Sequence, residues 1–289
     1  MKNLAIYYFL TFLVFLISCN EIESIPPKEY SLDGDYAQEI QQLENFYFSG
    51  LDLVVERLDM KFPTSLSVNS NFEEKLFMDI LNELNEEIFY FSEDQINNYS
   101  IRMKNLLISK NKSDARTEQL RLNDAGIFNT KQISMSNKFV EQLLQTDDPY
   151  SAKKIANSFQ NEILESSLNY EEKISLLSLS TGTRAVSDFI INDGIGKVRD
   201  KINRGERDEN QVYGCSINMR NVWGDAVVGF AGGAVAGCYA GATAGTVAFP
   251  LLGTVTGCVS AGMVGGAGGF ISGASYSIVS GLLLSCFRL

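Results

Sequence analysis

The C-terminal part of the chain contains a long stretch without any charged side chain. Residues 226–287 are sixty-two consecutive positions that include no Asp, Glu, Lys or Arg. Sixteen of the 24 glycines lie between Gly224 and Gly281, mixed with Ala, Val, Thr and Ser rather than with the Pro, Gln and Glu of disordered linkers. A soluble domain almost never contains such a stretch, and this tail is apolar enough to enter a lipid bilayer.

Small residues recur at every fourth position of the tail. The first series consists of glycines only: Gly229, Gly233, Gly237, Gly241 and Gly245. The second series is Gly253, Gly257, Ala261, Gly265, Gly269, Gly273, Ser277 and Gly281. Where a helix face lacks side chains, two backbones approach closely, and dispersion with weak Cα–H hydrogen bonds replaces the hydrophobic drive that lipid cannot supply. We therefore assign these residues to helix packing.

Pro250 separates the two series and disfavours helical geometry in the residue before it. Residues 226–249 would span about 36 Å as a helix, more than the roughly 30 Å core of a bilayer. Residues 251–287 are too many for one simple span, so we expect this segment to be tilted, broken near residues 265–269, or partly interfacial. The simplest shape is a helical hairpin. Because glycine is a poor helix former in water, we expect the tail to become helical on meeting a membrane.

The N-terminus has the pattern of an export signal. Lys2 precedes an uncharged apolar run over residues 4–17, and the small Ser18 stands directly before Cys19. The last four residues, Leu-Ile-Ser-Cys, resemble a bacterial lipobox, which implies a signal peptide over 1–18 and lipidation of Cys19. The alternative is an anchor helix that stays attached. The resemblance implies a lipoprotein of the bacterial outer membrane or cell surface, or one released from the cell.

Four further cysteines lie in or beside the tail: Cys215, Cys238, Cys258 and Cys286. An even number in an exported protein implies two disulfides, with three possible pairings. We prefer 215–286 with 238–258, because both pairs are nearly symmetric about Pro250 and a hairpin would bring their members together. The alternative is four buried free thiols in a tail that never reaches an oxidising compartment.

Between a tether over 19–35 and the tail, the pattern predicts an acidic helical domain over 36–192. Apolar residues recur there at three- and four-residue intervals, as an amphipathic helix requires. We expect about five helices, at residues 36–58, 72–110, 130–144, 151–168 and 170–191. The run Ser180 to Thr183 reads as a short polar turn signal within the last of them, and it lacks the glycines and lysine of a phosphate loop.

Residues 193–210 connect this region to the tail domain, which we place at 211–289. Ten of these eighteen residues are charged, so the segment is expected to be an exposed linker. Arg199, Arg204 and Arg207 are candidate sites for cleavage by a protease specific for basic residues. The alternative is a hinge without processing. The overall fold class is all-α, a helical bundle followed by a glycine-zipper, membrane-active helical hairpin.

Composition excludes several functions. The chain has no histidine, which excludes Ser-His-Asp and Cys-His catalysis and histidine-ligated metal, and we identify no catalytic residues, metal site or cofactor. Adjacent carboxylates such as Glu86 and Glu87 point in different directions on a helix and fit a solvated surface better than an acid/base pair. The net charge of −11 argues against a nucleic-acid partner. We therefore expect a protein that is not an enzyme.

The tail, from Asn221-Val222-Trp223-Gly224 through the small-xxx-small series with its cysteines, resembles the glycine-zipper region of class II bacteriocins, including the Blp-type family. The double-glycine leader of that family is absent. The resemblance implies a lipid-anchored antibacterial protoxin whose hairpin inserts into and permeabilises the target membrane after cleavage in the linker. The partners implied are the target bilayer, a surface receptor, a processing protease, an immunity protein and further copies of the chain. The alternative is a structural envelope lipoprotein anchored by its glycine-zipper segment.

Overall fold

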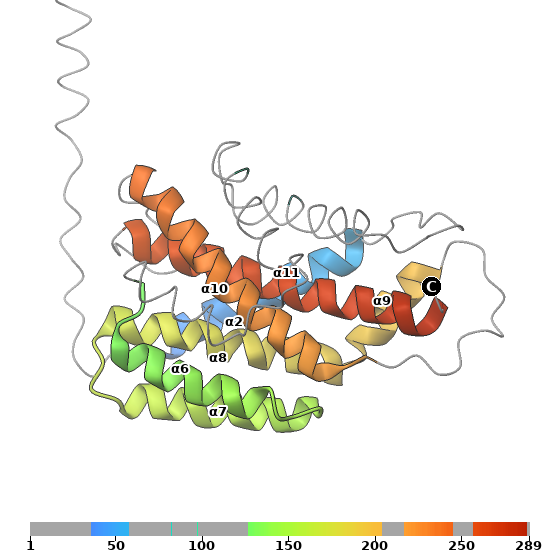
Figure 1. The fold of residues 1–289 in the computed structure, drawn as a ribbon, viewed down its shortest axis with the longest axis horizontal. Helices are drawn as coiled ribbons and strands as arrows, with labels where there is room; N and C mark the ends of the chain where they lie inside the picture. Colours follow the sequence, from blue (N-terminus) through green and yellow to red (C-terminus); the bar gives the residue numbers. More distant parts are fainter. Residues whose placement is uncertain are drawn as a thin grey trace, which may run out of the picture. The chain divides into compact units, whose positions relative to one another are not determined.

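The computed structural model describes residues 36–57, 127–203, 217–244 and 257–287, together with the single residues 82 and 97. Within these ranges the chain forms seven α-helices and no strand, so the all-α prediction is confirmed for this part (Figure 1). The helices are α2 (Ala37–Arg57), α6 (Thr130–Leu143), α7 (Pro149–Glu165), α8 (Tyr170–Ile191), α9 (Gly194–Asn203), α10 (Met219–Ala244) and α11 (Gly257–Phe287). The helix expected at 72–110 lies outside the described residues.

Local capping signals determine where several of these helices begin. Asn129 and Asn169 cap α6 and α8, and each cap is completed by a side chain three residues later, Gln132 or Glu172. Asp148 caps α7, in which Pro149 occupies the first turn. Hydrogen bonds from the Ser151 hydroxyl and from backbone amides lower the pKa of the Asp148 carboxyl, because they favour its charged form.

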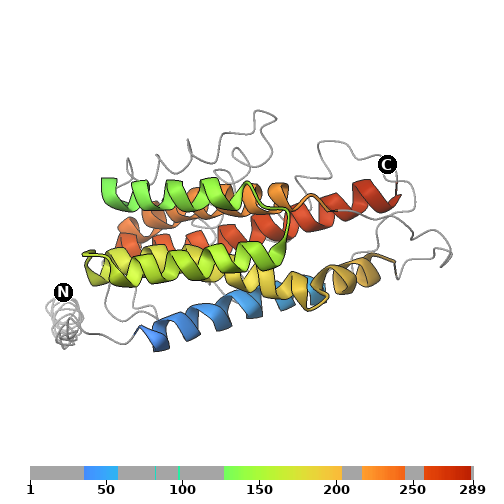
Figure 2. The ribbon, with the colours of Figure 1, turned by 90° about the horizontal axis from the view of Figure 1, so that it is seen from below.

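The described helices belong to one compact unit, with α8 at its centre. Residues 174–183 of α8 are all buried, and this helix packs against α7, α2 and α11. The arms of the tail, α10 and α11, cross each other on one side of α8, while α6 and α7 lie on the other side (Figures 1 and 2). The tail helices are therefore part of the same core as the charged helices.

Helix α9 corrects the expectation of an exposed linker for residues 194–203. Val198 and Ile202 are four residues apart and both are buried, so the segment has an apolar face despite its many charges. This face packs against the neighbouring helices α8, α11 and α2. Residues 204–210 lie outside the described residues.

Two further expectations about local breaks are wrong. Residues Ser180 to Thr183 continue α8 as helix rather than as a turn, and in the core the hydroxyls of Ser180 and Thr183 are satisfied by donating to carbonyl oxygens of the preceding turn. Likewise, α11 runs unbroken from Gly257 to Phe287, which excludes a break near residues 265–269. Packing against α10 compensates there for the low helix propensity of glycine.

Candidate functional site

The arms of the tail, α10 and α11, approach each other at the small residues that recur at every fourth position of the sequence. A Cβ atom built on Gly229 would lie 2.1 Å from the carbonyl oxygen of Gly269, and one on Gly237 would lie 2.1 Å from that of Ala261. Real Cβ atoms do not come so near to backbone. These positions therefore accept only glycine without displacement of a helix.

The contacts follow one antiparallel register. Between the two pairs just given lies a third, in which a Cβ on Gly265 would be 2.3 Å from the carbonyl oxygen of Gly233. A fourth pair brings Gly273 against the carbonyl oxygen of Asp225. Each step of four residues forward along α10 is matched by four residues backward along α11. The small-residue series thus predicts the contact faces of both helices.

The remaining glycines assigned to packing are less fully described. Gly241 lies in α10, and Gly257 is the first residue of α11. Gly245 and Gly253 lie outside the described residues. The tail helices are buried in the core of the protein, which supplies packing that isolated glycine-rich helices lack.

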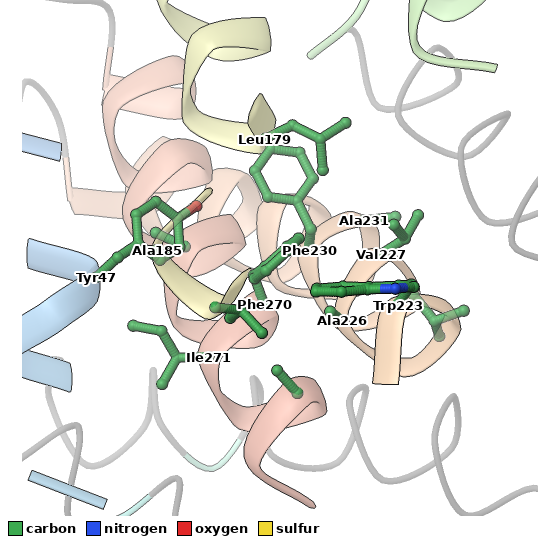
Figure 3. Packing of buried hydrophobic residues seen from close by; sticks show 14 of the residues in the cluster. Tyr47, Leu179, Ala185, Trp223, Ala226, Val227, Phe230, Ala231, Phe270 and Ile271 are labelled. Carbon is green, nitrogen blue, oxygen red and sulfur yellow. The ribbon is translucent and has the colours of Figure 1, made fainter. Parts of the chain in front are cut away.

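A junction around Tyr47 joins the tail to the charged helices. Tyr47 of α2 is fully buried, and its hydroxyl shares a hydrogen bond of 3.1 Å with Ser178 of α8. Its ring meets Phe270 of α11 edge-on, with 5.8 Å between the centroids (Figure 3). On α8, a Cβ on Gly182 would lie 2.7 Å from the Tyr47 ring, so the absence of a side chain there makes room for it.

Further aromatic side chains bury the start of the tail. The single tryptophan of the chain, Trp223, is fully buried in α10 beside Ala226 and Val227 (Figure 3). Further along the same helix, Phe230 contacts Phe128, which precedes α6, at 6.3 Å between ring centroids. The described start of the tail is therefore packed against residues that come from the charged region of the sequence.

Ion pairs connect the charged helices to one another. Arg184 of α8 binds Glu44 of α2 and donates to Gln160 of α7 at 2.5 Å, so one guanidinium joins three helices. Lys153 of α7 lies 2.5 Å from Asp188 of α8. We call α2 and α6–α9 the cover, since these helices carry most of the charged side chains, whereas Arg220 and Asp225 at the start of α10 are the charged residues of the arms.

Among the described helices, one is long and apolar enough to cross a membrane by length and composition. It covers Ala261–Ser285, 25 residues within α11, and 78% of its most apolar window is buried inside the protein. The core helix of a soluble protein passes the same test. No three cysteine or carboxylate side chains come together as metal ligands within the described part of the chain.

The structure places only some of the other predicted site residues. Cys238 is buried and disulfide-bonded, but its partner is not among the side chains described. A Cβ on Gly262 would lie 3.6 Å from the Cβ of Cys238. Pairing of Cys238 with Cys258 stays a prediction, as does pairing of Cys215, outside the described residues, with Cys286.

Arg199 is a poor cleavage site in this fold. It lies within α9 beside Asp200, at 3.6 Å, and proteases bind their substrates as extended segments. Arg204 and Arg207, together with Cys19, lie outside the described residues. Any cleavage in this region is therefore expected beyond the end of α9.

The Tyr47 junction should make stability depend on pH in alkaline solution. Burial raises the pKa of the Tyr47 hydroxyl well above its ordinary value of 10.0, although the hydrogen bond with Ser178 partly lowers it. Above pH 10 the unfolded chain loses this proton and the folded chain keeps it, so the free energy of unfolding falls by up to about 1.4 kcal/mol per pH unit. Tyr47→Phe should remove this part of the slope, which urea unfolding from pH 9 to 11 would measure. An identical slope in both proteins would contradict a buried phenol.

Comparisons of the chain with protein-family models, with curated proteins and with solved structures found no match.

Sequence reasoning missed the residues that join tail and cover. Tyr47 belongs to an apolar stripe of Leu43, Tyr47, Leu51 and Val54, which predicts a buried face but not its partner. The relevant signal on α8 was the spacing of Ser178, Gly182 and Ala185, which are small residues on one face. That pattern is the same one that identified the contact faces of the tail.

Proposed function

We propose that this protein is a lipid-anchored antibacterial protoxin whose C-terminal hairpin, α10 with α11, inserts into and permeabilises the membrane of a target bacterium. The observation that carries the proposal is a helical pair, uncharged from residue 226 onward, that is packed through its own backbone and buried against charged helices. The lipobox-like sequence at Cys19 and the resemblance of the tail to class II bacteriocins support export and the membrane as target.

The packing between the two arms is suited to a bilayer. Their backbone polar groups are satisfied within helices, which a membrane-spanning segment requires. The contacts between glycine and backbone depend on dispersion rather than on the exclusion of water, so transfer to lipid does not remove them. The pair can therefore move as one unit from the protein core into a membrane.

The enclosure by the cover accounts for how such a pair stays soluble until it is needed. Side chains such as Phe230, Phe270 and Ile271 are fully or almost fully buried, so within the described residues these parts of the pair are kept away from water. The indole N–H of Trp223 finds no hydrogen-bond partner among the described residues. Tryptophan at a membrane interface has the headgroup region as partner, which favours the inserted state.

Cleavage between α9 and α10 supplies a release step in this proposal. Before cleavage the hairpin is covalently continuous with the cover, and afterwards only non-covalent contacts hold it. A receptor, a processing protease, an immunity protein and self-association of inserted hairpins are partners that the proposal implies. Self-association would have to use other surfaces than Gly229, Gly237 and Gly265, since these already face the partner arm.

The test uses the intact mature chain with a specific protease site introduced between residues 207 and 213. Cutting in place should make the protein depolarise sensitive bacteria at concentrations at which the uncut protein has no effect, followed with a membrane-potential dye. The same cut in a Gly237→Leu variant should give little or no depolarisation, because leucine cannot fit against the Ala261 carbonyl. The matched control is Gly224→Ala, where the added Cβ makes only an ordinary contact with Leu144.

The second candidate is a structural envelope lipoprotein anchored by its glycine-zipper segment, and the length and composition of Ala261–Ser285 favour it. In that case the tail remains a permanent part of the producing cell's own envelope protein. Cutting would then depolarise no strain, and the protein would fractionate with the membrane of the producer.

A further inference from the structure

Tail and cover are each held together by contacts of their own. The arms α10 and α11 pack through backbone at Gly229, Gly237 and Gly265, without help from the cover. In the cover, the Arg184 guanidinium joins α8 to α2 and α7, and the Lys153–Asp188 pair joins α7 to α8. The protein is therefore expected to open along the interface between the tail and the cover, which we call the opening plane.

Tyr47 spans this plane. Its hydroxyl is bonded to Ser178 and its ring lies against Gly182, both in the cover, while the edge of the ring meets Phe270 of the tail. The side chain is fully buried, so parting of the two bodies must expose it or break its contact with Phe270. Figure 3 shows the ring between α2, α8 and α11.

We propose that Tyr47, seated on Gly182 and Ser178, is the latch that keeps the hairpin under its cover, and that opening proceeds by separation of α11 from α2 and α8. The regulatory meaning of the latch rests on the function proposed above. The latch itself is a property of the fold in water and is tested there.

The latch differs from an ordinary core residue in the set of helices that it holds together. Loss of an ordinary core side chain promotes opening around its own neighbours. Loss of the latch should promote an opening that exposes α10 and α11 while α7 and α8 stay paired through Lys153 and Asp188. Phe139 provides a matched control, because it is an almost fully buried ring that stacks on Phe159 between α6 and α7, at 4.4 Å between centroids.

The experiment is native-state hydrogen exchange by mass spectrometry on the full mature chain in water, without lipid. Tyr47→Ala should speed exchange of the amides in α10 and α11 by about a hundredfold and leave α7 much less affected. Phe139→Ala should instead affect α6 and α7 first. Equal acceleration in all helices with both variants would overturn the latch.

Two milder variants keep the test decisive if Tyr47→Ala does not fold. Tyr47→Phe keeps the ring but loses the hydrogen bond to Ser178, and should speed exchange in α10 and α11 by about fivefold. Gly182→Ala pushes the ring away from α8 and should act on the same helices. If neither variant changes the exchange of α10 and α11 relative to α7, the latch is wrong. Selective opening in water without depolarisation after cleavage would retain the latch and refute the protoxin.

Discussion

Replacement of Gly229 by alanine is expected to lower the free energy of unfolding by about 3 kcal/mol. The added Cβ would lie 2.1 Å from the Gly269 carbonyl oxygen, and the only relief is a shift of one helix against the other. Helix propensity acts in the opposite direction, because alanine is better than glycine by about 1 kcal/mol in a helix. Packing therefore predicts that Gly229→Ala lowers the free energy of unfolding, whereas helix propensity predicts that it raises it.

Gly224→Ala is the matched control for this substitution. It lies in the same helix, and its added Cβ would meet only a Leu144 methyl at 3.7 Å. Propensity should dominate there and raise stability by about 0.5–1 kcal/mol. Urea unfolding followed by far-UV circular dichroism would measure both variants. If Gly229→Ala were as stable as Gly224→Ala, the close approach of α10 and α11 would be refuted.

The second large effect concerns removal of the tail. A chain that ends at residue 210 should not fold cooperatively, because α8 would lose its neighbours in α11 and the pocket around Tyr47 would open. Each large buried side chain contributes about 1.5–3 kcal/mol, and several are lost at once, against a total stability of about 5–15 kcal/mol. We expect a broad thermal transition, binding of the dye ANS and loss of the near-ultraviolet dichroism.

The comparison is with the full mature chain measured under the same conditions. If the shortened chain showed a sharp thermal transition and did not bind ANS, the charged helices would be an independent domain. The sequence itself suggested such a division at residues 193–210. A single core shared by the tail and the charged helices predicts instead that the shortened chain has a broad transition.

The helices expected at 36–58, 130–144, 151–168 and 170–191 could be predicted closely because their signals are local. The predicted helix at 170–191 coincides with α8, whose start is fixed by Asn169 and Glu172. The contact faces of α10 and α11 could also be predicted, because glycine at every fourth position leaves one face of a helix without side chains. In both cases the signal consists of residues that lie close together in the sequence.

What the sequence did not reveal are contacts between distant residues. An uncharged helix has the same composition in lipid and in a protein core, so its enclosure by the cover was not predictable from the tail alone. Tyr47 and Ser178 are 131 positions apart, and nothing in either neighbourhood indicates the other. Because residues 194–203 carry many charges, they were predicted to be a linker. Val198 and Ile202 nevertheless have the four-residue spacing of a helix face, and both are buried in α9.

In the proposed function the hairpin is enclosed by the cover in water and enters lipid on release. Trp223 reports both states because it is the only tryptophan of the chain and lies buried in α10. The measurement is its fluorescence in vesicles of phospholipid brominated on the acyl chains, before and after cutting between residues 207 and 213. We expect weak quenching by the brominated lipid before the cut and strong quenching after it, with little access for acrylamide in either state. Quenching by acrylamide rather than by the brominated lipid after the cut would place the released hairpin in water and refute its insertion.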